Sequence, residues 1–391
     1  MYSFAKRLDN VSGSAIRQIF SLLADPDIIS FAGGNPAPES FPKEEIAKIS
    51  QKSLLEKGDT ILQYGGTLGM PAFIDVVVDM YKKYGVNASN NEIIITTGSS
   101  QGIELMSKAF LNPGDSVLVE SPTFLGALQT FLTYEANVVE VAMDDEGIIL
   151  KELEDAIVKN KPKFLYTIPT FQNPTGKTMG KKRRQEVYDV CKKYNVLILE
   201  DDPYRELRYS GEKLPLIKSM DTQGIVVNLL SFSKIISPGL RVGAVNASSD
   251  IIAKFNILKQ GIDVHTPNLT QEIALEYVKE GMLDGHIKKI CKMYTKKINA
   301  MQSAIKKYFP EEIKVTHPDG GLFIWATLPD YVDAVEVFKA AVKAKVAFVP
   351  GTYFFAAGGH KNTLRLNFSM ASEEKINIGI EKLSEVIKTF I

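Results

Sequence analysis

The sequence predicts a two-domain α/β protein with a large, mostly parallel sheet and a smaller α+β domain. Three observations support this. The chain has 391 residues, more than one hydrophobic core usually holds. Its middle alternates short apolar runs with helical patterns. After Pro267 the pattern changes to a long amphipathic helix and mixed elements. Continuous apolar strands separated by helices are typical of parallel sheets covered on both faces.

The large domain is predicted from six segments in the middle of the chain. Each strand candidate is an apolar run bounded by turn residues, and each helix candidate has apolar residues at helical spacing. In chain order they are a strand in 91–100 that leads into a helix at about 101–111, strands in 115–122 and 163–176, a helix in 183–195, and strands in 196–204 and 224–234. Ligands of such sheets bind beyond the carboxyl ends of the strands, where this chain has its unusual residues.

The smaller domain is predicted from the C-terminal third. Its candidates are a long helix at 286–309, a strand in 320–328, a helix at 333–344, a strand in 363–369 and a last helix. The turn-rich stretch "FAGGNPAPESFP" suggests that the N-terminal segment joins this domain. We therefore expect an N-terminal arm or lid with part of the small domain at 1–45, a large domain at 46–285 and a small domain at 286–391.

Composition narrows the function classes. Lys plus Arg and Asp plus Glu are both 46, so the formal net charge is zero, which argues against nucleic acid or an anionic membrane as a partner. No apolar run approaches the roughly 18 residues of a membrane span, and the first residues lack an apolar signal-peptide core. Cys191 and Cys291 have neither metal-ligand spacing nor disulfide density, so we expect no metal and a cytoplasmic location.

Two segments follow predicted strands: the first could bind an anion, and the second could present a side-chain amide to a ligand. In "TGSSQG" at 97–102, exposed backbone N–H groups and the helix dipole favour an anion, and Ser99 and Ser100 add hydroxyl donors. A plain Ser N-cap explains the same residues. "NPTG" at 173–176 presents the side-chain amide of Asn173, although an ordinary Asx-turn has the same sequence.

Two further segments add opposite charges. In "EDDPY", Asp201 ends an apolar strand, where a carboxylate is costly unless it meets a cation such as a protonated ring nitrogen. Tyr204 adds a hydroxyl, and a helix cap or a surface acid is the alternative. In "SFSKIISPGLRVG", Lys234 supplies an amine that can form a Schiff base. The same segment supplies three candidate phosphate ligands, Ser231, Ser233 and Arg241.

Together these segments resemble the fold-type I, pyridoxal 5'-phosphate (PLP)-dependent aminotransferases of class I/II, especially the branch of 2-aminoadipate and kynurenine aminotransferases. The likeness covers essentially the whole chain and includes "LQYGGTLGMPAF" and "TLRLNFS". It implies the aspartate aminotransferase-like fold, PLP as cofactor and a homodimer with shared active sites. It also implies ping-pong transfer of an amino group from an L-amino acid to a 2-oxo acid such as 2-oxoglutarate. Candidate donors are 2-aminoadipate and aromatic or branched aliphatic amino acids.

The resemblance implies roles for the residues around the cofactor ring. Lys234 forms the Schiff base with PLP and then acts as general base, and Asp201 pairs with the ring nitrogen. Asn173 and Tyr204 bond the ring's phenolic oxygen. Phe124 stands where this branch usually has Tyr, so it keeps the stacking on the ring but lacks the hydroxyl.

The resemblance also implies the ligands of the phosphate and of the substrate. The phosphate is held by Ser99, Ser100, Ser231, Ser233 and Arg241, with Tyr64 reaching it from the neighbouring subunit. Arg365 binds the substrate α-carboxylate, helped by the Gly34 region and Asn173. Arg17, in the amphipathic stretch 12–20, corresponds to a lid arginine that receives the distal carboxylate of an acidic substrate. A solvated helix arginine is the plainer interpretation of Arg17.

Two other functions are compatible with parts of this pattern. A PLP-dependent β-lyase or decarboxylase on the same fold shares the Lys, Asp and Arg pattern and would differ in its products. A ligand-sensing regulator would carry this domain behind a basic DNA-binding region. The chain starts directly with "MYSFAKRLDN" and has no basic excess, so we expect an enzyme with small-molecule substrates.

Overall fold

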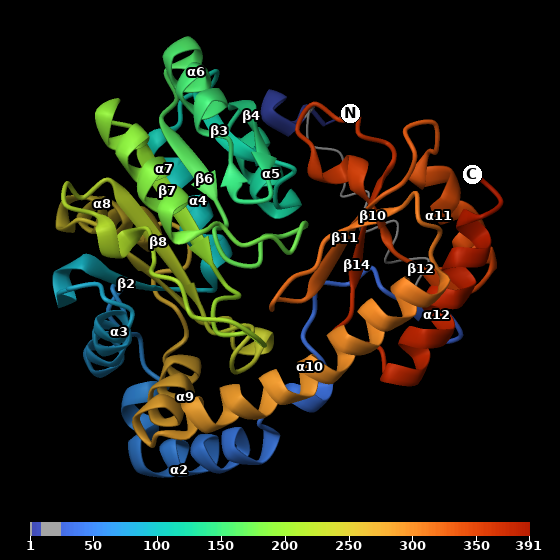
Figure 1. The fold of residues 1–391 in the computed structure, drawn as a ribbon. Coiled ribbons are helices and arrows are strands. Elements are labelled where there is room, and N and C mark those ends of the chain that lie inside the picture. The colour runs from blue at the N-terminus through green and yellow to red at the C-terminus, as the bar shows by residue number, and fades with distance from the viewer. Residues whose placement is uncertain (1, 9–24) are drawn as a thin grey trace.

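The computed structural model describes residues 2–8 and 25–391. An eight-stranded sheet forms the centre of the larger half of the molecule (Figure 1). In order across the sheet its strands are β2 (Ile93–Thr96), β9 (Gly243–Asn246), β8 (Val226–Ser231), β7 (Leu197–Asp202), β6 (Phe164–Thr167), β3 (Ser116–Ser121), β4 (Asn137–Asp144) and β5 (Gly147–Ile148). Only β9 and β5 run opposite to the other strands. The predicted large, mostly parallel sheet is confirmed.

Helices cover both faces of this sheet because its strands are apolar on both sides. In β3, Val117 and Val119 pack into the cluster under one set of helices, while Leu118 packs into the cluster on the opposite face. The first face is covered by α4 (Ser99–Phe110), α5 (Leu125–Thr133) and α8 (Ser249–Gln260). The second face is covered by α3 (Pro71–Lys83), α6 (Leu150–Asn160), α7 (Lys181–Lys193) and α9 (Asn268–Lys279). The outer helix α2 (Lys43–Ile61) packs along α9.

A four-stranded antiparallel sheet forms the smaller half. Its strands, in order across the sheet, are β10 (Lys314–Val315), β11 (Phe323–Thr327), β14 (Thr363–Asn367) and β13 (Val349–Pro350). It packs with α11 (Ala334–Lys343) and α12 (Glu373–Ile387) around a core that includes Phe338, Leu366 and Leu383. The N-terminal strand β1 (Ile29–Ser30) pairs with β12 (Val346–Ala347) beside it.

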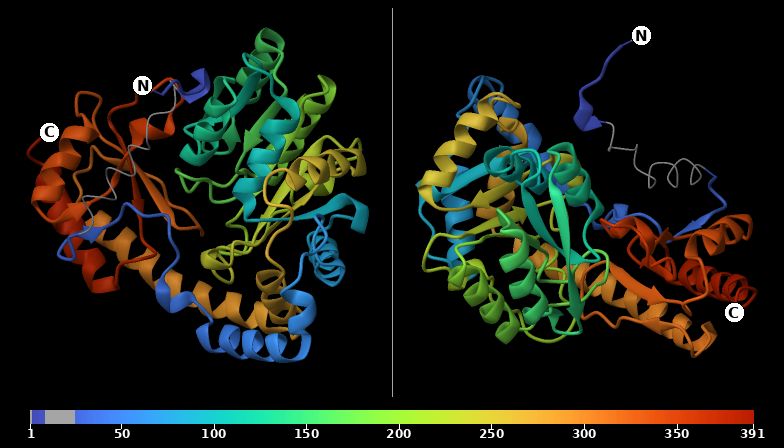
Figure 2. Two further views of the ribbon diagram at one scale, coloured as in Figure 1. Left: turned by 180° about the vertical axis from the view of Figure 1, so that it is seen from behind. Right: turned by 90° about the horizontal axis from the view of Figure 1, so that it is seen from above.

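Helix α10 (Met282–Tyr308) joins the two halves, and Figures 1 and 2 show it running from α9 to the smaller sheet. Its buried residues Ile290, Tyr294, Ile298, Met301 and Ile305 recur every three or four positions, which is the spacing of one helix face. The helix begins at Met282, four residues before the predicted start.

Among the described residues, no helix is long and apolar enough to cross a membrane. Across the same residues, no group of three or more His, Cys, Asp or Glu side chains is arranged to hold a metal ion.

Candidate active site

The register of the large sheet brings the predicted segments together. Gly243 of β9 is paired with Thr96 on one side and with Ser231 on the other, so the loops after β2 and β8 lie next to each other. Strand β7 is parallel to β8, with Asp201 paired to Leu229. The predicted site residues that belong to the large sheet therefore gather at the carboxyl ends of β2, β6, β7 and β8, as expected for a parallel sheet, whereas Arg365 lies in β14 of the smaller sheet.

The loop between β2 and α4 forms one wall of the site. Gly98 is the N-cap of α4, and the helix begins at Ser99 instead of near Gln101. The serines are therefore the first two residues of the helix and not its cap. Gly98 has φ +80°, and a Cβ there would lie 2.4 Å from Nη2 of Arg241, so glycine lets this guanidinium cross the start of α4. Arg241 donates to the carbonyl of Thr97 at 3.2 Å, which places a cation beside free helical N–H groups.

The Asn173 turn presents its side-chain amide to the site. Gln172 caps the turn, because its Oε1 accepts from both the N–H and the hydroxyl of Thr175, at 2.9 and 2.6 Å. Asn173 makes no Asx-turn and instead accepts from Nη1 of Arg365 at 2.8 Å. Behind the turn, buried Glu120 accepts from the backbone N–H of Ile168 and from Gln172, both at 3.1 Å.

Asp201 is buried, with 3% of its surface exposed, which excludes a surface acid. Its Oδ2 accepts a hydrogen bond from the hydroxyl of Tyr166 at 2.9 Å, while its buried Oδ1 has no partner in the structure. The pKa of this carboxyl is raised to about 7, mainly by desolvation and also by Asp202, while the hydrogen bond from Tyr166 opposes the shift. A cation at Oδ1 would remove this penalty.

The Lys234 amine is also held without an opposite charge. Its Nζ donates to the carbonyl of Gly34 at 2.9 Å. The pKa of this amine is lowered to about 8, mainly by burial and also by the cationic Arg365 and Arg241. A large fraction of Lys234 is thus neutral near pH 8, and a neutral amine is a nucleophile and a base.

Arg365 is buried between two aromatic rings. Its guanidinium carbon lies 4.3 Å from the ring centre of Phe323 and 4.9 Å from that of Phe354. It donates to Asn173 and, at 2.7 Å, to the carbonyl of Ala32, while its buried Nε has no hydrogen-bond partner among residues 2–8 and 25–391. Burial lowers the pKa of this guanidinium to about 10, so it remains a cation at neutral pH and can receive a carboxylate.

One cavity of about 370 Å³ collects these residues. Twelve predicted site residues line it, namely Gly34, Ser99, Ser100, Phe124, Asn173, Asp201, Tyr204, Ser231, Ser233, Lys234, Arg241 and Arg365. Tyr64 does not line it; its side chain lies on the surface, 82% exposed, with its ring 6.0 Å from His265. Arg17 lies outside the described residues. The cavity therefore combines an anion site, an unpaired carboxylate, a reactive amine and a carboxylate-binding cation.

The sequence interpretation did not include Tyr166 or Gln172. The signal for Tyr166 was a phenol inside the apolar run "KFLYTI", because a buried hydroxyl usually requires a hydrogen-bond partner. No comparable signal marks Gln172, since its partners are set by the folded turn.

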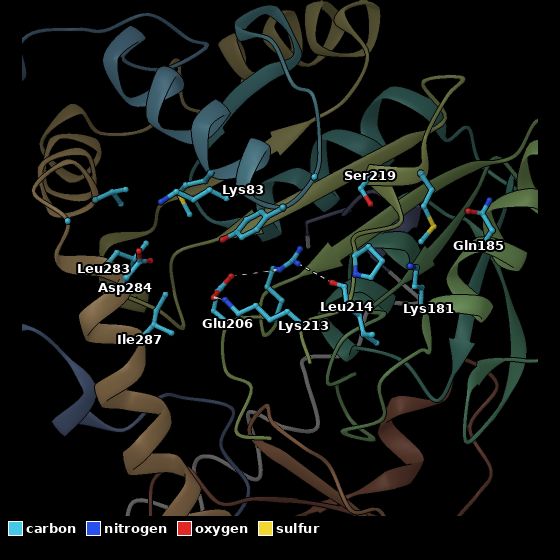
Figure 3. Close-up of a pocket in the computed structure, with 18 residues that line it drawn as sticks. Lys83, Lys181, Gln185, Glu206, Lys213, Leu214, Ser219, Leu283, Asp284 and Ile287 are labelled. Carbon is cyan, nitrogen blue, oxygen red and sulfur yellow. Dashed lines mark hydrogen bonds and ion pairs between the residues drawn. The ribbon is translucent and has the colours of Figure 1, made fainter. Parts of the chain in front are cut away.

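A second cavity, of about 700 Å³, lies at the ends of α3 and α9 and contains none of the predicted site residues (Figure 3). Its buried charges are paired. Arg205 lies 3.3 Å from Asp202 and 3.8 Å from Glu206, and the other carboxylate oxygen of Glu206 lies 2.5 Å from Lys213. Although this second cavity is larger than the first, its buried charges have partners of opposite charge.

Comparison with known proteins gives a consistent result. A family model described as aminotransferase class I and II matches residues 26–383. Aromatic-amino-acid aminotransferase 1 of Thermococcus litoralis is 43% identical over 98% of this chain and 94% of the relative. The 2-aminoadipate transaminase of Thermus thermophilus is 38% identical over 99% and 96%. The structure of Pyrococcus horikoshii kynurenine aminotransferase with PMP superimposes with a TM-score of 0.95, at 42% identity over 99% and 97% of the two chains.

Proposed function

The chain belongs to the class I and II aminotransferases and is a PLP-dependent enzyme of that family, and from this premise we propose a role for each residue of the 370 Å³ cavity. When bound, PLP supplies the carbonyl carbon that takes up an amino group and the ring that accepts electrons from the substrate. The side chains of the cavity fit this group. The observation that carries the assignment is that Lys234, Asp201 and Arg365 converge on one cavity and that none of them has a partner of opposite charge among the described residues.

The start of α4 and the loop after β8 would hold the phosphate. The first N–H groups of α4 have no partners within the helix, and the macrodipole adds partial positive charge there. Arg241 adds a full charge, and the side chains that would add hydroxyl donors are Ser99, Ser100, Ser231 and Ser233. Asp201 would pair with the protonated ring nitrogen through its free Oδ1, which accounts for a buried carboxylate oxygen without a partner. Asn173 and Tyr204 would bond the phenolic oxygen, and Phe124 would stack on the ring.

Lys234 would be both the covalent attachment point of PLP and the base that moves the proton. Its Nζ would take the proton from the substrate Cα and return it to the cofactor carbon that becomes aminated. The lowered pKa of this amine suits the task, since proton transfer is most efficient when the base titrates near the working pH. Burial of the amine also limits its exchange with water.

Arg365 would bind the α-carboxylate of the substrate, with Asn173 and the Gly34 region beside it. Asn173 Oδ1 and the carbonyl of Ala32 already fix two of its N–H groups, so the guanidinium is oriented before the substrate arrives. A fixed carboxylate determines which bond at Cα stands perpendicular to the ring and therefore which bond breaks. This orientation would favour transamination over decarboxylation.

We infer a broad donor range that includes aromatic amino acids, 2-aminoadipate and branched aliphatic amino acids, with 2-oxoglutarate as acceptor. The names of the similar proteins support the aromatic and acidic donors. A panel of amino donors with 2-oxoglutarate, read by formation of the matching 2-oxo acid, tests this inference. Ammonia and pyruvate from the same panel would instead identify a lyase. For Arg17, which remains a sequence prediction, Arg17→Ala should raise KM for acidic donors and leave leucine unchanged.

We also propose a homodimer in which Tyr64 reaches the phosphate of the partner's cofactor. Exposed apolar side chains support this interface: Leu55 and Leu62 on and just after α2, Tyr64, and Val264 next to the His265 that Tyr64 contacts. Tyr64 does not line the cavity of its own chain, which supports the proposal that it serves the site of a partner subunit.

Mixing two inactive variants tests the shared site. Tyr64→Phe subunits combined with Lys234→Ala subunits should regain activity above either parent, because one site of each heterodimer then carries both lesions and the other neither. Heterodimers without recovered activity would contradict the placement of Tyr64 in trans.

The domain boundaries at 45 and 285 and a cytoplasmic location are further proposals. Pairing of β1 with β12 supports an N-terminal segment that belongs with the small domain. Two cysteines present as free thiols are typical of a reducing compartment.

A further inference from the structure

Tyr166 lies directly behind Asp201 in the large sheet. Strands β6 and β7 are parallel, and Tyr166 is paired with Leu199, two residues before Asp201. Paired residues of neighbouring strands point to the same face, and so do residues two apart, so both side chains lie on the face that carries α4, α5 and α8. Tyr166 is completely buried and does not line the cavity.

The hydrogen bond between these residues has a defined direction. Burial and the nearby carboxylates raise the pKa of Tyr166 well above its usual value, so the phenol stays protonated and donates. It donates to Oδ2 of Asp201 at 2.9 Å, and Oδ1 is left without a partner. The other buried acid nearby, Glu120, already accepts from Thr167, Ile168 and Gln172.

We propose that Tyr166 is a positioning residue that holds Asp201 by one oxygen and thereby keeps the other oxygen available for the ring nitrogen of the cofactor. This inference rests on the proposed role of Asp201. A carboxylate on a short side chain can rotate about two bonds, and Tyr166 is its one hydrogen-bond partner within the described residues. Without the phenol, Asp201 would lose its fixed orientation and the one hydrogen-bond donor that the described residues give it, while desolvation and Asp202 continue to disfavour its charge.

The test removes the hydroxyl alone. Tyr166→Phe should weaken the binding of PLP to the apoprotein about tenfold, the order expected for a lost hydrogen bond to a charged group. Tyr81→Phe is the matched control, because Tyr81 is equally buried and donates at 2.8 Å to Asn228 in the same sheet without lining the cavity. The PLP affinity of Tyr81→Phe should stay within about twofold of the parent, although we expect both variants to have a lower melting temperature than the parent.

A double-mutant cycle distinguishes positioning from general support of the fold. If Tyr166 acts through Asp201, Tyr166→Phe should have no further effect on PLP affinity in an Asp201→Asn background. Equal losses in both backgrounds, or equal losses from Tyr166→Phe and Tyr81→Phe, would overturn the proposal. Parent-like affinity of Tyr166→Phe would also overturn it.

The same cycle separates this proposal from the proposed function. If Asp201→Asn weakens PLP binding and Tyr166→Phe does not, the positioning role of Tyr166 is wrong while the proposed role of Asp201 stands. Normal PLP binding and turnover in Asp201→Asn would reject the assignment of Asp201, and the role of Tyr166 with it.

Discussion

The 700 Å³ cavity of the larger half and the 370 Å³ cavity, which Arg365 of the smaller sheet also lines, differ in how their buried charges are satisfied. In the 700 Å³ cavity, Arg205 and Glu206 each have opposite charges within 4 Å. In the 370 Å³ cavity, the described partners of Lys234, Asp201 and Arg365 are neutral carbonyl, amide and phenol groups.

This difference indicates which of the two cavities would be stabilised by binding a charged ligand. A buried charge without a counter-charge costs stability, and the cost is recovered when a ligand supplies the missing partner. Among the described residues, the smaller cavity has no cation for buried Asp201 and no anion for buried Arg365 or for the exposed Arg241, and a protonated ring nitrogen, a carboxylate substrate and a phosphate would provide them. The larger cavity lacks neither, so its volume alone predicts no chemistry.

Replacement of Lys234 should have the largest effect on transamination. Lys234→Ala should lower transamination at least about a thousandfold, because it removes the proposed base at Cα and the proposed attachment point of PLP. Initial rates with an aromatic donor and 2-oxoglutarate measure this. A Lys234→Ala protein with near-normal turnover would invalidate the contrast between the two cavities.

Replacement of Arg365 should have the second largest effect, which is on kcat/KM. Arg365→Ala should lower kcat/KM about ten- to a hundredfold for every donor, since each donor has an α-carboxylate and a charge-assisted hydrogen bond is worth roughly 1.5–3 kcal/mol. Arg365→Lys keeps the charge but not the planar fork and should fall between Ala and the parent. A loss confined to acidic donors would show that Arg365 binds the distal carboxylate instead.

A smaller effect concerns pH. In the proposed role of Lys234 the neutral amine is the nucleophile, and the pKa of this amine is lowered from 10.5 to about 8, mainly by burial. The rate at which PLP attaches to the apoprotein should therefore rise with pH and level off above about 8. Stopped-flow absorbance at a series of pH values measures it. A rate that keeps rising beyond pH 10 would indicate an ordinary solvated lysine.

The smallest effect is expected in the cavity of Figure 3. Lys213→Ala should leave turnover within about twofold of the parent, because Lys213 is more than half exposed and pairs only with Glu206. This variant is also the control for Lys234→Ala, since both remove one lysine from a cavity. A strong loss of turnover would mean that the paired cavity takes part in the reaction.

The sequence was sufficient to predict those features of the fold and site that follow from the order of segments along the chain. Apolar runs located the strands, and the polar residues after them, such as Ser99, Asp201 and Lys234, meet because parallel strands end at one edge. Tyr166 was missed because its role depends on the register between β6 and β7, which no local pattern encodes. Tyr64 cannot be tested in a single chain, because its proposed partner belongs to a second subunit.

The central claim is that Lys234 is the residue to which PLP is attached. Borohydride reduction of the holoprotein followed by proteolysis and mass spectrometry locates the lysine that carries the phosphopyridoxyl group. We expect one modified peptide, containing "SFSK", with the label on Lys234 and none on Lys213. A stoichiometric label on any other lysine, or a yellow holoprotein that yields no labelled peptide, would contradict it.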